Sequence, residues 1–283
     1  MLDTKVNIAV DADHAAVFAA CEPGTGLCTV VGIDGSFSRD VGAQLAVKAD
    51  GTTVGSLADG CLEQQLANDL LALDRPVVRR YGRGSDVIDF RLPCGGGLDI
   101  HLHPAPDHKD CEAVVANLAR RKPASFEIAL ENGAFQRRYI PALNVRVFGE
   151  GPELVMLTKL AEASRADVTS VRKDRLSLGA MSGLPSADPY TAVVLLFHDH
   201  EWEAALLEEA LGSDAFYIGA QGGENARVRR YRELLMRGVP EENLSRITSP
   251  IGLIENCKNP EALAVSAFAQ IVERYERLRT ASR

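Results

Sequence analysis

The sequence predicts an α/β protein of two domains: an N-terminal α+β domain followed by a C-terminal Rossmann-like domain built on a parallel sheet. Three observations support this fold class. The chain has 283 residues, which suits two domains of about 100–200 residues each. Its first half mixes alternating strand patterns with short helices, whereas its second half alternates strand with helix, as doubly wound sheets do. We expect domains at 1–140 and 141–283, with a linker near 137–141.

The elements of the N-terminal domain follow from periodicity and turn residues. Four leucines recur from Leu62 to Leu73 at offsets of four, four and three, which is one apolar stripe of a helix. Alternating residues around an Asp50-Gly51 turn indicate a β-hairpin. In order, we expect a helix at about 13–22, strands at 27–33, 43–47 and 53–56, a helix at 61–73, strands near 77, at 87–90 and at 98–102, and a helix at 110–120.

The C-terminal domain follows from buried strands and the helices between them. A strand at 145–148 leads into Gly149-Glu150-Gly151, and leucines at helical spacing come next. The segment 191–197 is the clearest buried strand of the chain, since its residues are almost continuously apolar.

A dinucleotide fingerprint is incomplete in this domain. Gly149 and Gly151 match its first two glycines, but Leu154 occupies the third place, where close helix packing needs a small residue. Arg172 and Lys173 stand where an acid would bind the ribose. We therefore expect no tight binding of NAD, and basic residues here suit a phosphorylated or pterin nucleotide better.

Composition excludes several classes of protein. Hydrophobic residues make up 46% and charged residues 25%, the values of a globular protein. A formal net charge of −8 disfavours nucleic acid as a partner. We find no apolar run long enough to cross a bilayer and no basic leader, so we expect a cytoplasmic protein without membrane contact.

Three glycine-rich loops each follow or precede a predicted strand. The loop 92–100 sets Cys94 against Gly95, Gly96 and Gly97, which expose backbone N–H groups to a ligand. A second loop brings Gly60 and Cys61 to the start of a helix, where unpaired N–H groups favour an anion. The third, at 35–43, adds Ser36 and Arg39. Either cysteine could equally be a small buried residue in a tight turn. Together, the loops suggest one site.

A basic segment lies between the two cysteine loops. Arg79, Arg80 and Arg83 lie beside Gly82 and Gly84, and the planar guanidinium fork suits phosphate oxygens. The alternative is a solvated basic turn.

Two His-x-His pairs place imidazoles on one face of an extended segment. His101 and His103 form one pair, and His198 and His200 form the other. No third ligand is convincing for either pair, so we do not predict a metal there. His198 should instead lie at the carboxyl edge of the parallel sheet, where α/β proteins bind ligands.

The motifs carry a resemblance. The order Gly-Ser-x-x-Arg-x-x-Gly-Ala at 35–43, Gly-Cys-Leu-Glu at 60–63 and Pro-Cys-Gly-Gly-Gly at 93–97 resembles the xanthine dehydrogenase accessory family, the XdhC/CoxI-type proteins. Tyr-Ile-Gly-Ala at 217–220 and Ser-Pro-Ile-Gly-Leu at 249–253 agree with it. The resemblance implies a maturation factor, not a metabolic enzyme: it binds the sulfurated molybdenum cofactor, protects it and helps insert it into a molybdenum hydroxylase.

The resemblance also implies the site and the partners. The cofactor would be molybdopterin or its cytosine dinucleotide form, with Cys61 or Cys94 meeting the metal or its dithiolene end. The expected partners are a molybdenum hydroxylase apo-enzyme and a cysteine desulfurase, and the chain is expected to form a homodimer. The expected cofactor-binding residues are Ser36, Arg39, Gly60, Cys61, Glu63, Arg83, Cys94, Gly95, Gly96 and Gly97.

Two other functions stay open at this point. The first is an NAD(P)-linked oxidoreductase that uses the Rossmann-like domain with Cys61 or Glu63 in its active site, but this requires the fingerprint that the chain lacks. The second is a thiol-based sulfur carrier, which requires a resolving cysteine beside the reactive one. No such pair is visible in the sequence.

Overall fold

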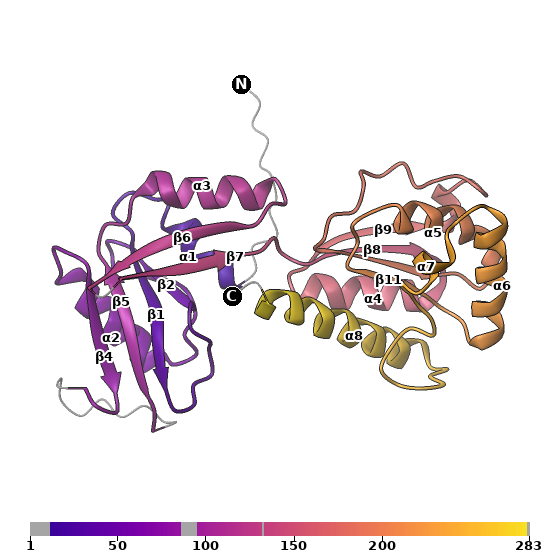
Figure 1. Cartoon of the computed structure of the whole chain (residues 1–283). Coiled ribbons are helices and arrows are strands. Elements are labelled where there is room, and N and C mark those ends of the chain that lie inside the picture. The colour runs from indigo at the N-terminus through magenta and orange to yellow at the C-terminus, as the bar shows by residue number, and fades with distance from the viewer. Residues whose placement is uncertain (1–11, 86–94, 132, 282–283) are drawn as a thin grey trace. The chain divides into compact units, whose positions relative to one another are not determined.

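The computed structural model describes residues 12–85, 95–131 and 133–281 (Figure 1). The described chain divides into two compact units, which meet in sequence between Pro141 and Ala142. Within these ranges, no helix has both the length and the apolar character needed to cross a membrane.

The first unit is built on an antiparallel five-stranded sheet in the order β3-β2-β1-β5-β4. Its strands are β1 (Gly26–Asp34), β2 (Gln44–Val47), β3 (Thr53–Gly55), β4 (Val77–Gly82) and β5 (Gly97–His103). A separate hairpin joins β6 (Ala124–Leu130) to β7 (Gly133–Tyr139). The expected linker at 137–141 is therefore wrong at its start, because β7 runs to Tyr139. The expected strand at 87–90 lies outside the described residues.

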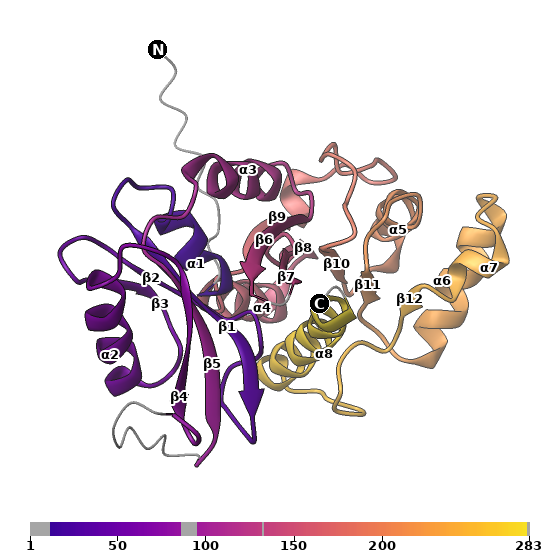
Figure 2. The same ribbon diagram turned by 60° about the vertical axis from the view of Figure 1, so that its left-hand side comes forward.

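Helices cover both faces of this sheet (Figure 2). They are α1 (Ala12–Ala19), α2 (Gly60–Leu71) and α3 (His108–Ala119). The predicted leucine stripe is confirmed, because Leu62, Leu66 and Leu70 are buried in one core with Leu98 and Ile100 of β5. On the other face, α1, α3 and the β6–β7 hairpin share a second core.

Strand β1 changes the face that it presents to α2 at a bulge. Its register with β5 shifts between Val30 and Gly32. Before the shift, Val30 lies in the core beneath α2, and after it, Ile33 packs against that same core. Gly32 and Asp34 are consequently turned to the opposite face, where Asp99 of β5 lies against Gly32.

The second unit is built on a parallel five-stranded sheet in the order β12-β11-β10-β8-β9. Its strands are β8 (Asn144–Gly149), β9 (Asp167–Arg172), β10 (Thr191–Leu196), β11 (Tyr217–Ala220) and β12 (Ile247–Thr248). Every strand pair is parallel, which confirms the predicted Rossmann-like architecture. All six residues of β10 are buried, as its apolar run predicts.

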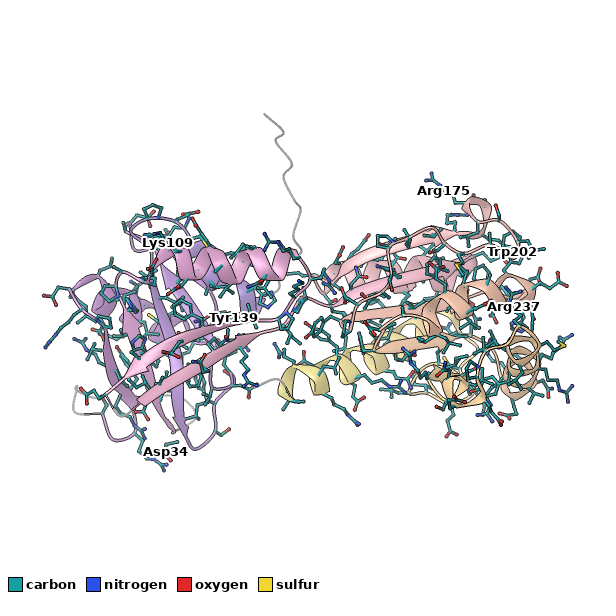
Figure 3. All side chains as sticks on the ribbon, turned by 45° about the horizontal axis from the view of Figure 1, so that its top comes forward. Asp34, Lys109, Tyr139, Arg175, Trp202 and Arg237 are labelled. Atoms are coloured by element: carbon teal, nitrogen blue, oxygen red, sulfur yellow. The ribbon has the colours of Figure 1, made fainter. Side chains whose placement is uncertain are left out.

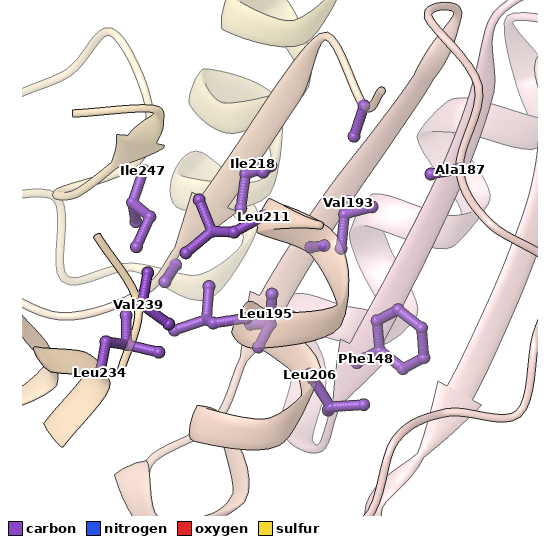
Figure 4. Close-up of a cluster of buried hydrophobic side chains, with 14 of the residues drawn as sticks. Phe148, Ala187, Val193, Leu195, Leu206, Leu211, Ile218, Leu234, Val239 and Ile247 are labelled. Atoms are coloured by element: carbon purple, nitrogen blue, oxygen red, sulfur yellow. The ribbon is translucent and has the colours of Figure 1, made fainter. Parts of the chain in front are cut away.

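Helices flank the parallel sheet on both sides. They are α4 (Gly151–Ala163), α5 (Ala204–Leu211), α6 (Glu224–Met236), α7 (Glu241–Leu244) and α8 (Pro260–Ala281), with 3₁₀ turns η1 (Lys173–Arg175) and η2 (His200–Trp202). Helices α4 and α8 pack on each other. The core beneath α5 and α6 joins Leu206 and Leu234 to Val193, Leu195 and Ile218 of the sheet (Figure 4).

Candidate functional site

Several glycine-rich segments of the first unit meet at one edge of its sheet. Strands β1 and β4 both end opposite the first residue of β5, because Asp34 and Gly82 each pair with Gly97. The loops after β1 and β4 and the loop before β5 therefore share this edge. We call the segments 35–43, 56–61, 83–85 and 95–97 the loop edge.

Arg39 joins two of these loops. Its Nε donates to the backbone oxygen of Ser56 at 3.2 Å, and its Nη1 donates to Ser38 O at 3.2 Å. The 35–43 loop itself closes on β1 through a bond of 2.7 Å from Gly42 N to Val30 O. Both Arg39 and Ser36 are exposed. The structure thus brings the Ser36 and Arg39 loop against the loop that leads to Cys61.

A compact turn carries the chain into α2. Asp59 caps the helix by accepting a hydrogen bond from Leu62 N at 3.0 Å. Glu63 reaches back, and its Oε1 accepts from Leu57 N at 2.6 Å and from Ser56 Oγ at 3.2 Å. Glu63, one of the expected cofactor ligands, thus braces the loop in this structure.

Cys61 lies in the first turn of α2 beside open space. It is exposed, whereas Cys28 and Cys111 are buried and Cys21 and Cys257 are partly buried. Burial raises the pKa of the Cys28 thiol and raises that of Cys111 to about 12. Those two thiols stay protonated near neutral pH. Among the described cysteines, Cys61 is the one presented to solvent.

The three glycines before β5 have different surroundings. Gly95 is exposed at φ +68°, and a Cβ there would meet nothing within 4 Å. Gly96 is buried, and its Cα lies 3.5 Å from the position of a Cβ on Gly35. Gly97 has no room for a side chain, because a Cβ would lie 2.5 Å from Arg80 Nη2. Gly95 is thus open to a ligand, and Gly97 is structural.

Cys94 lies outside the described residues. Its convergence with Cys61, and a shared contact with a metal, stay predictions. Since Gly95 follows Cys94 directly and belongs to the loop edge, those predictions keep their basis.

The basic segment is already paired with carboxylates. Arg80 Nη1 lies 2.9 Å from Asp99 Oδ2, and its Nη2 lies 3.0 Å from Asp34 Oδ2. Arg83 Nη2 lies 2.5 Å from Asp34 Oδ1, at the free end of β1 (Figure 3). The Arg83 hydrogen bond holds the pKa of Asp34 below its usual range, and Arg80 adds to the effect.

These pairs change our interpretation of the segment. Arg79 and Arg80 belong to strand β4, not to a turn, and Arg79 Nη1 lies 3.4 Å from Asp69 Oδ1. A phosphate at Arg80 or Arg83 would have to displace Asp34 or Asp99. Arg39 differs, since it has no carboxylate partner among the ion pairs of the described residues.

Asp34, Asp99 and the backbone of Ser56 belong to the site but are not among the residues expected from the sequence. A signal for the two carboxylates was present, because Asp34 directly precedes Gly35 and Asp99 comes two residues after Gly97. An acid beside each of two convergent loops predicts partners for the arginines between them. Nothing in the sequence indicates the Ser56 carbonyl, since any residue carries one.

The two histidines on β5 differ in burial, since His101 is buried and His103 is half-buried. His101 is 4% exposed, and burial lowers its pKa to about 4. The rings of His101 and His103 stand 5.7 Å apart in an edge-on arrangement. Among the residues that the structure describes, no group of three or more His, Cys, Asp or Glu side chains is arranged to hold a metal ion.

Two family models match the chain. The model described as the XdhC and CoxI family matches residues 22–82, and the one described as the XdhC Rossmann domain matches residues 145–271. The first segment includes Ser36, Arg39 and Cys61 and ends before Arg83.

Related proteins match both halves together. The molybdenum cofactor insertion chaperone PaoD of Escherichia coli is 30% identical over 270 residues, which cover 88% of this chain and 82% of that protein. A probable xanthine dehydrogenase subunit from Bacillus subtilis is 24% identical over 89% of this chain and 93% of its own. A crystal structure described as a xanthine dehydrogenase from Bacillus halodurans superposes with a TM-score of 0.70 at 20% identity, covering 97% of this chain and 98% of that one.

Proposed function

This chain belongs to the XdhC and CoxI family, and we propose that it is a chaperone that binds the molybdenum cofactor, protects it and delivers it to an apo-molybdenum hydroxylase. The cofactor is the cargo of the protein. The loop edge of the first unit is the proposed binding surface.

The observation that carries this proposal is the bond from Arg39 Nε to Ser56 O. It holds a guanidinium, whose charge no described carboxylate neutralises, against the loop that presents the exposed thiol of Cys61. The cofactor is an anionic pterin whose metal is bound through sulfur. A cation suits its charge, and a thiol suits a soft metal carrying sulfur.

Some of the remaining loop-edge residues are free to bind the cofactor, and others already have partners within the chain. Ser36, Gly60 and Gly95 are exposed, so the Ser36 hydroxyl and the backbone N–H groups there are placed to donate to oxygens of the cargo. Arg83 is tied to Asp34, and its part would be to orient the loop rather than to neutralise a phosphate. The proposal covers both molybdopterin and its cytosine dinucleotide form.

Partners follow from the same proposal. An apo-molybdenum hydroxylase would dock near the loop edge and compete with the free cofactor for it. A cysteine desulfurase, as the source of the cofactor's sulfur, and a second copy of the chain are further proposed partners.

The first test is retention of cofactor by the chain purified from cells that make it, measured as molybdenum and pterin after desalting. Arg39→Ala should reduce retention about tenfold, because it removes a charge-assisted bond. Cys61→Ser should lower the molybdenum content. Cys94→Ala should lower cofactor retention, an expectation that rests on the sequence motif alone. Arg75→Ala is the control, since exposed Arg75 precedes the opposite end of β4. Equal retention by parent and Arg39→Ala would contradict the proposal.

The second test removes the chain from its host. We expect the molybdenum hydroxylase to assemble but to lack activity and cofactor. A normally loaded, fully active hydroxylase in the deletion strain would reject the chaperone function.

A further inference from the structure

The parallel sheet of the second unit has an edge that the proposed function does not use. Strand β8 lies between β9 and β10 in the sheet. The chain passes from β8 to β9 on one side of β8 and then crosses back to form β10 on the other side. The carboxyl ends of β8 and β10 therefore face a crevice, the switch point where open α/β sheets bind ligands. The residues there are Gly149, which ends β8, the following residues as far as Glu153, and Phe197 to His200, after β10.

A buried carboxylate in this crevice lacks a hydrogen-bond donor. Glu153, in the first turn of α4, is 7% exposed, and its Oε2 is buried without a partner. Buried polar atoms in folded proteins are nearly always bonded, because an unpaired one costs free energy. Oε2 is therefore an unsatisfied acceptor, which a hydroxyl or an amino group of a ligand would satisfy.

Gly151 keeps the space beside Glu153 open. Gly151 has a φ of +88°, which favours glycine. A Cβ at this position would lie 2.8 Å from Glu153 Oε2 and 3.8 Å from His198 Nε2. The carboxylate and the exposed imidazole thus border the same notch. Oε2 itself is closed to solvent in this structure, so a ligand donor that enters beside Gly151 would reach it after a small shift of the Glu153 side chain.

A hollow suited to an anion lies one strand further along the same edge. Its volume is about 460 Å³, and its lining includes His200, Gly222, Gly223 and Arg229 together with Glu224, whose carboxylate is paired with Arg227 at 2.7 Å. Helix α6 starts there with Gly223 as its N-cap, and no side chain caps it. The first N–H groups of α6 are therefore left for a ligand, and the helix dipole favours a negative one.

A buried ion pair holds this hollow in shape. Glu203 Oε2 and Arg230 Nε lie 2.8 Å apart, with side chains 1% and 2% exposed. Arg230 Nη2 donates to Gln221 O at 2.8 Å, and its Nη1 donates to Ser249 Oγ at 2.9 Å. Glu203 Oε1 lies 3.2 Å from His200 Nδ1, which leaves Nε2 of that ring for the hollow.

From this arrangement, we infer that the second unit binds a nucleoside monophosphate across the carboxyl ends of β8, β10 and β11. The phosphate lies at the start of α6 near Arg229, and a sugar hydroxyl or base amino group donates to Glu153. Neighbouring strands are about 4.8 Å apart, so the ends of β8 and β11 are separated by about 10 Å, within reach of such a molecule. Lys173 does not take the phosphate, because it is paired with Glu150 at 3.2 Å. All residues of this site belong to the second unit.

Calorimetry on the full chain tests the inference with AMP, CMP, GMP, UMP, NAD and inorganic phosphate. We expect at least one monophosphate to bind in the submillimolar range and inorganic phosphate to compete with it. Glu153→Gln should weaken that nucleotide about tenfold or more, because it removes a charged acceptor. It should leave the affinity for inorganic phosphate unchanged. Glu162→Gln, an exposed change on the same helix, is the control.

A second pair of variants keeps the test decisive if Glu153→Gln fails to fold. Arg229→Ala should weaken nucleotide and inorganic phosphate alike by several-fold, while Arg232→Ala, exposed on the same helix, should match the parent chain. The inference is overturned if no monophosphate binds, if NAD binds more tightly than every monophosphate, or if folded Glu153→Gln binds the nucleotide as the parent does.

Discussion

Each unit holds an arginine against a carboxylate at one edge of its sheet, and the two pairs differ in burial. The side chains of Arg230 and Glu203 in the second unit are 2% and 1% exposed. Those of Arg83 and Asp34 in the first are 61% and 47% exposed. Water can replace a lost partner at a surface but not in an interior. The same residue types therefore give a rigid edge in one unit and an adaptable edge in the other, as release of a cargo requires.

The largest expected effect comes from breaking the buried pair. Arg230→Ala should cost the second unit about 3–5 kcal/mol of unfolding free energy, because Glu203 would remain as an uncompensated buried charge. Denaturant unfolding measures the loss. Arg237→Ala is the control, since its pair with Glu208 is about one-third exposed. Equal losses in both variants would break the comparison between buried and exposed pairs.

A smaller effect is expected at the loop edge from adding one methyl group. Gly97→Ala should cost about 1–3 kcal/mol, because the new Cβ would meet Arg80 Nη2 and the Arg83 backbone oxygen, each at 2.5 Å. Gly60→Ala should leave stability unchanged or slightly higher, since its Cβ meets nothing within 4 Å. Thermal unfolding compares the two. A tolerated Gly97→Ala would show that this part of the edge is also adaptable.

Acid should destabilise the first unit through a buried histidine in its interior. Burial lowers the pKa of His101 to about 4, against about 6.5 when unfolded. The unfolded chain binds the proton more readily, so stability is full above about pH 6.5 and falls as the pH drops toward 4. Unfolding of the parent and of His101→Gln over this range measures the effect. The variant should lose part of the pH dependence, and an unchanged slope would exclude His101 as its source.

The smallest expected effect comes from the exposed pair. Arg83→Ala should change stability little, and added salt should shrink the difference further. It should also reduce cofactor retention less than Arg39→Ala, because Arg83 is already paired with Asp34. Retention assays on the two variants rank them. A larger loss with Arg83→Ala would mean that the cofactor displaces Asp34. Arg83, rather than Arg39, would then be the main cation that binds the cofactor.

The sequence predicts the elements whose burial follows a simple period. The leucine stripe of α2 and the apolar run of β10 are confirmed. The hairpin β6–β7 was not predicted, although β6 does alternate, with Phe126 and Ile128 buried between exposed neighbours. The inward positions of β7 include Arg137 and Tyr139, which are buried although polar, so no apolar alternation marks that strand.

The site is less predictable than the fold because its contacts are long-range. Convergence of the loops could be expected, since each lies at a strand end. The pairing of Arg80 with Asp34 spans 46 residues, and no local pattern indicates it. The orphaned oxygen of Glu153 follows from packing around one helix turn, and a sequence does not contain packing.

The bulge in β1 sets a limit on how this protein can diverge. Because Val31 is the extra residue, regular pairing of the unchanged sequence with β5 would turn every later side chain of β1 over. Asp34 would then point into the leucine core beneath α2, and Arg80 would lose one of its two carboxylate partners. A lineage can lose the bulge without losing the charged edge only by deleting one residue with it, since a strand without Val31 still sets Gly32 opposite Asp99 and Asp34 opposite Gly97.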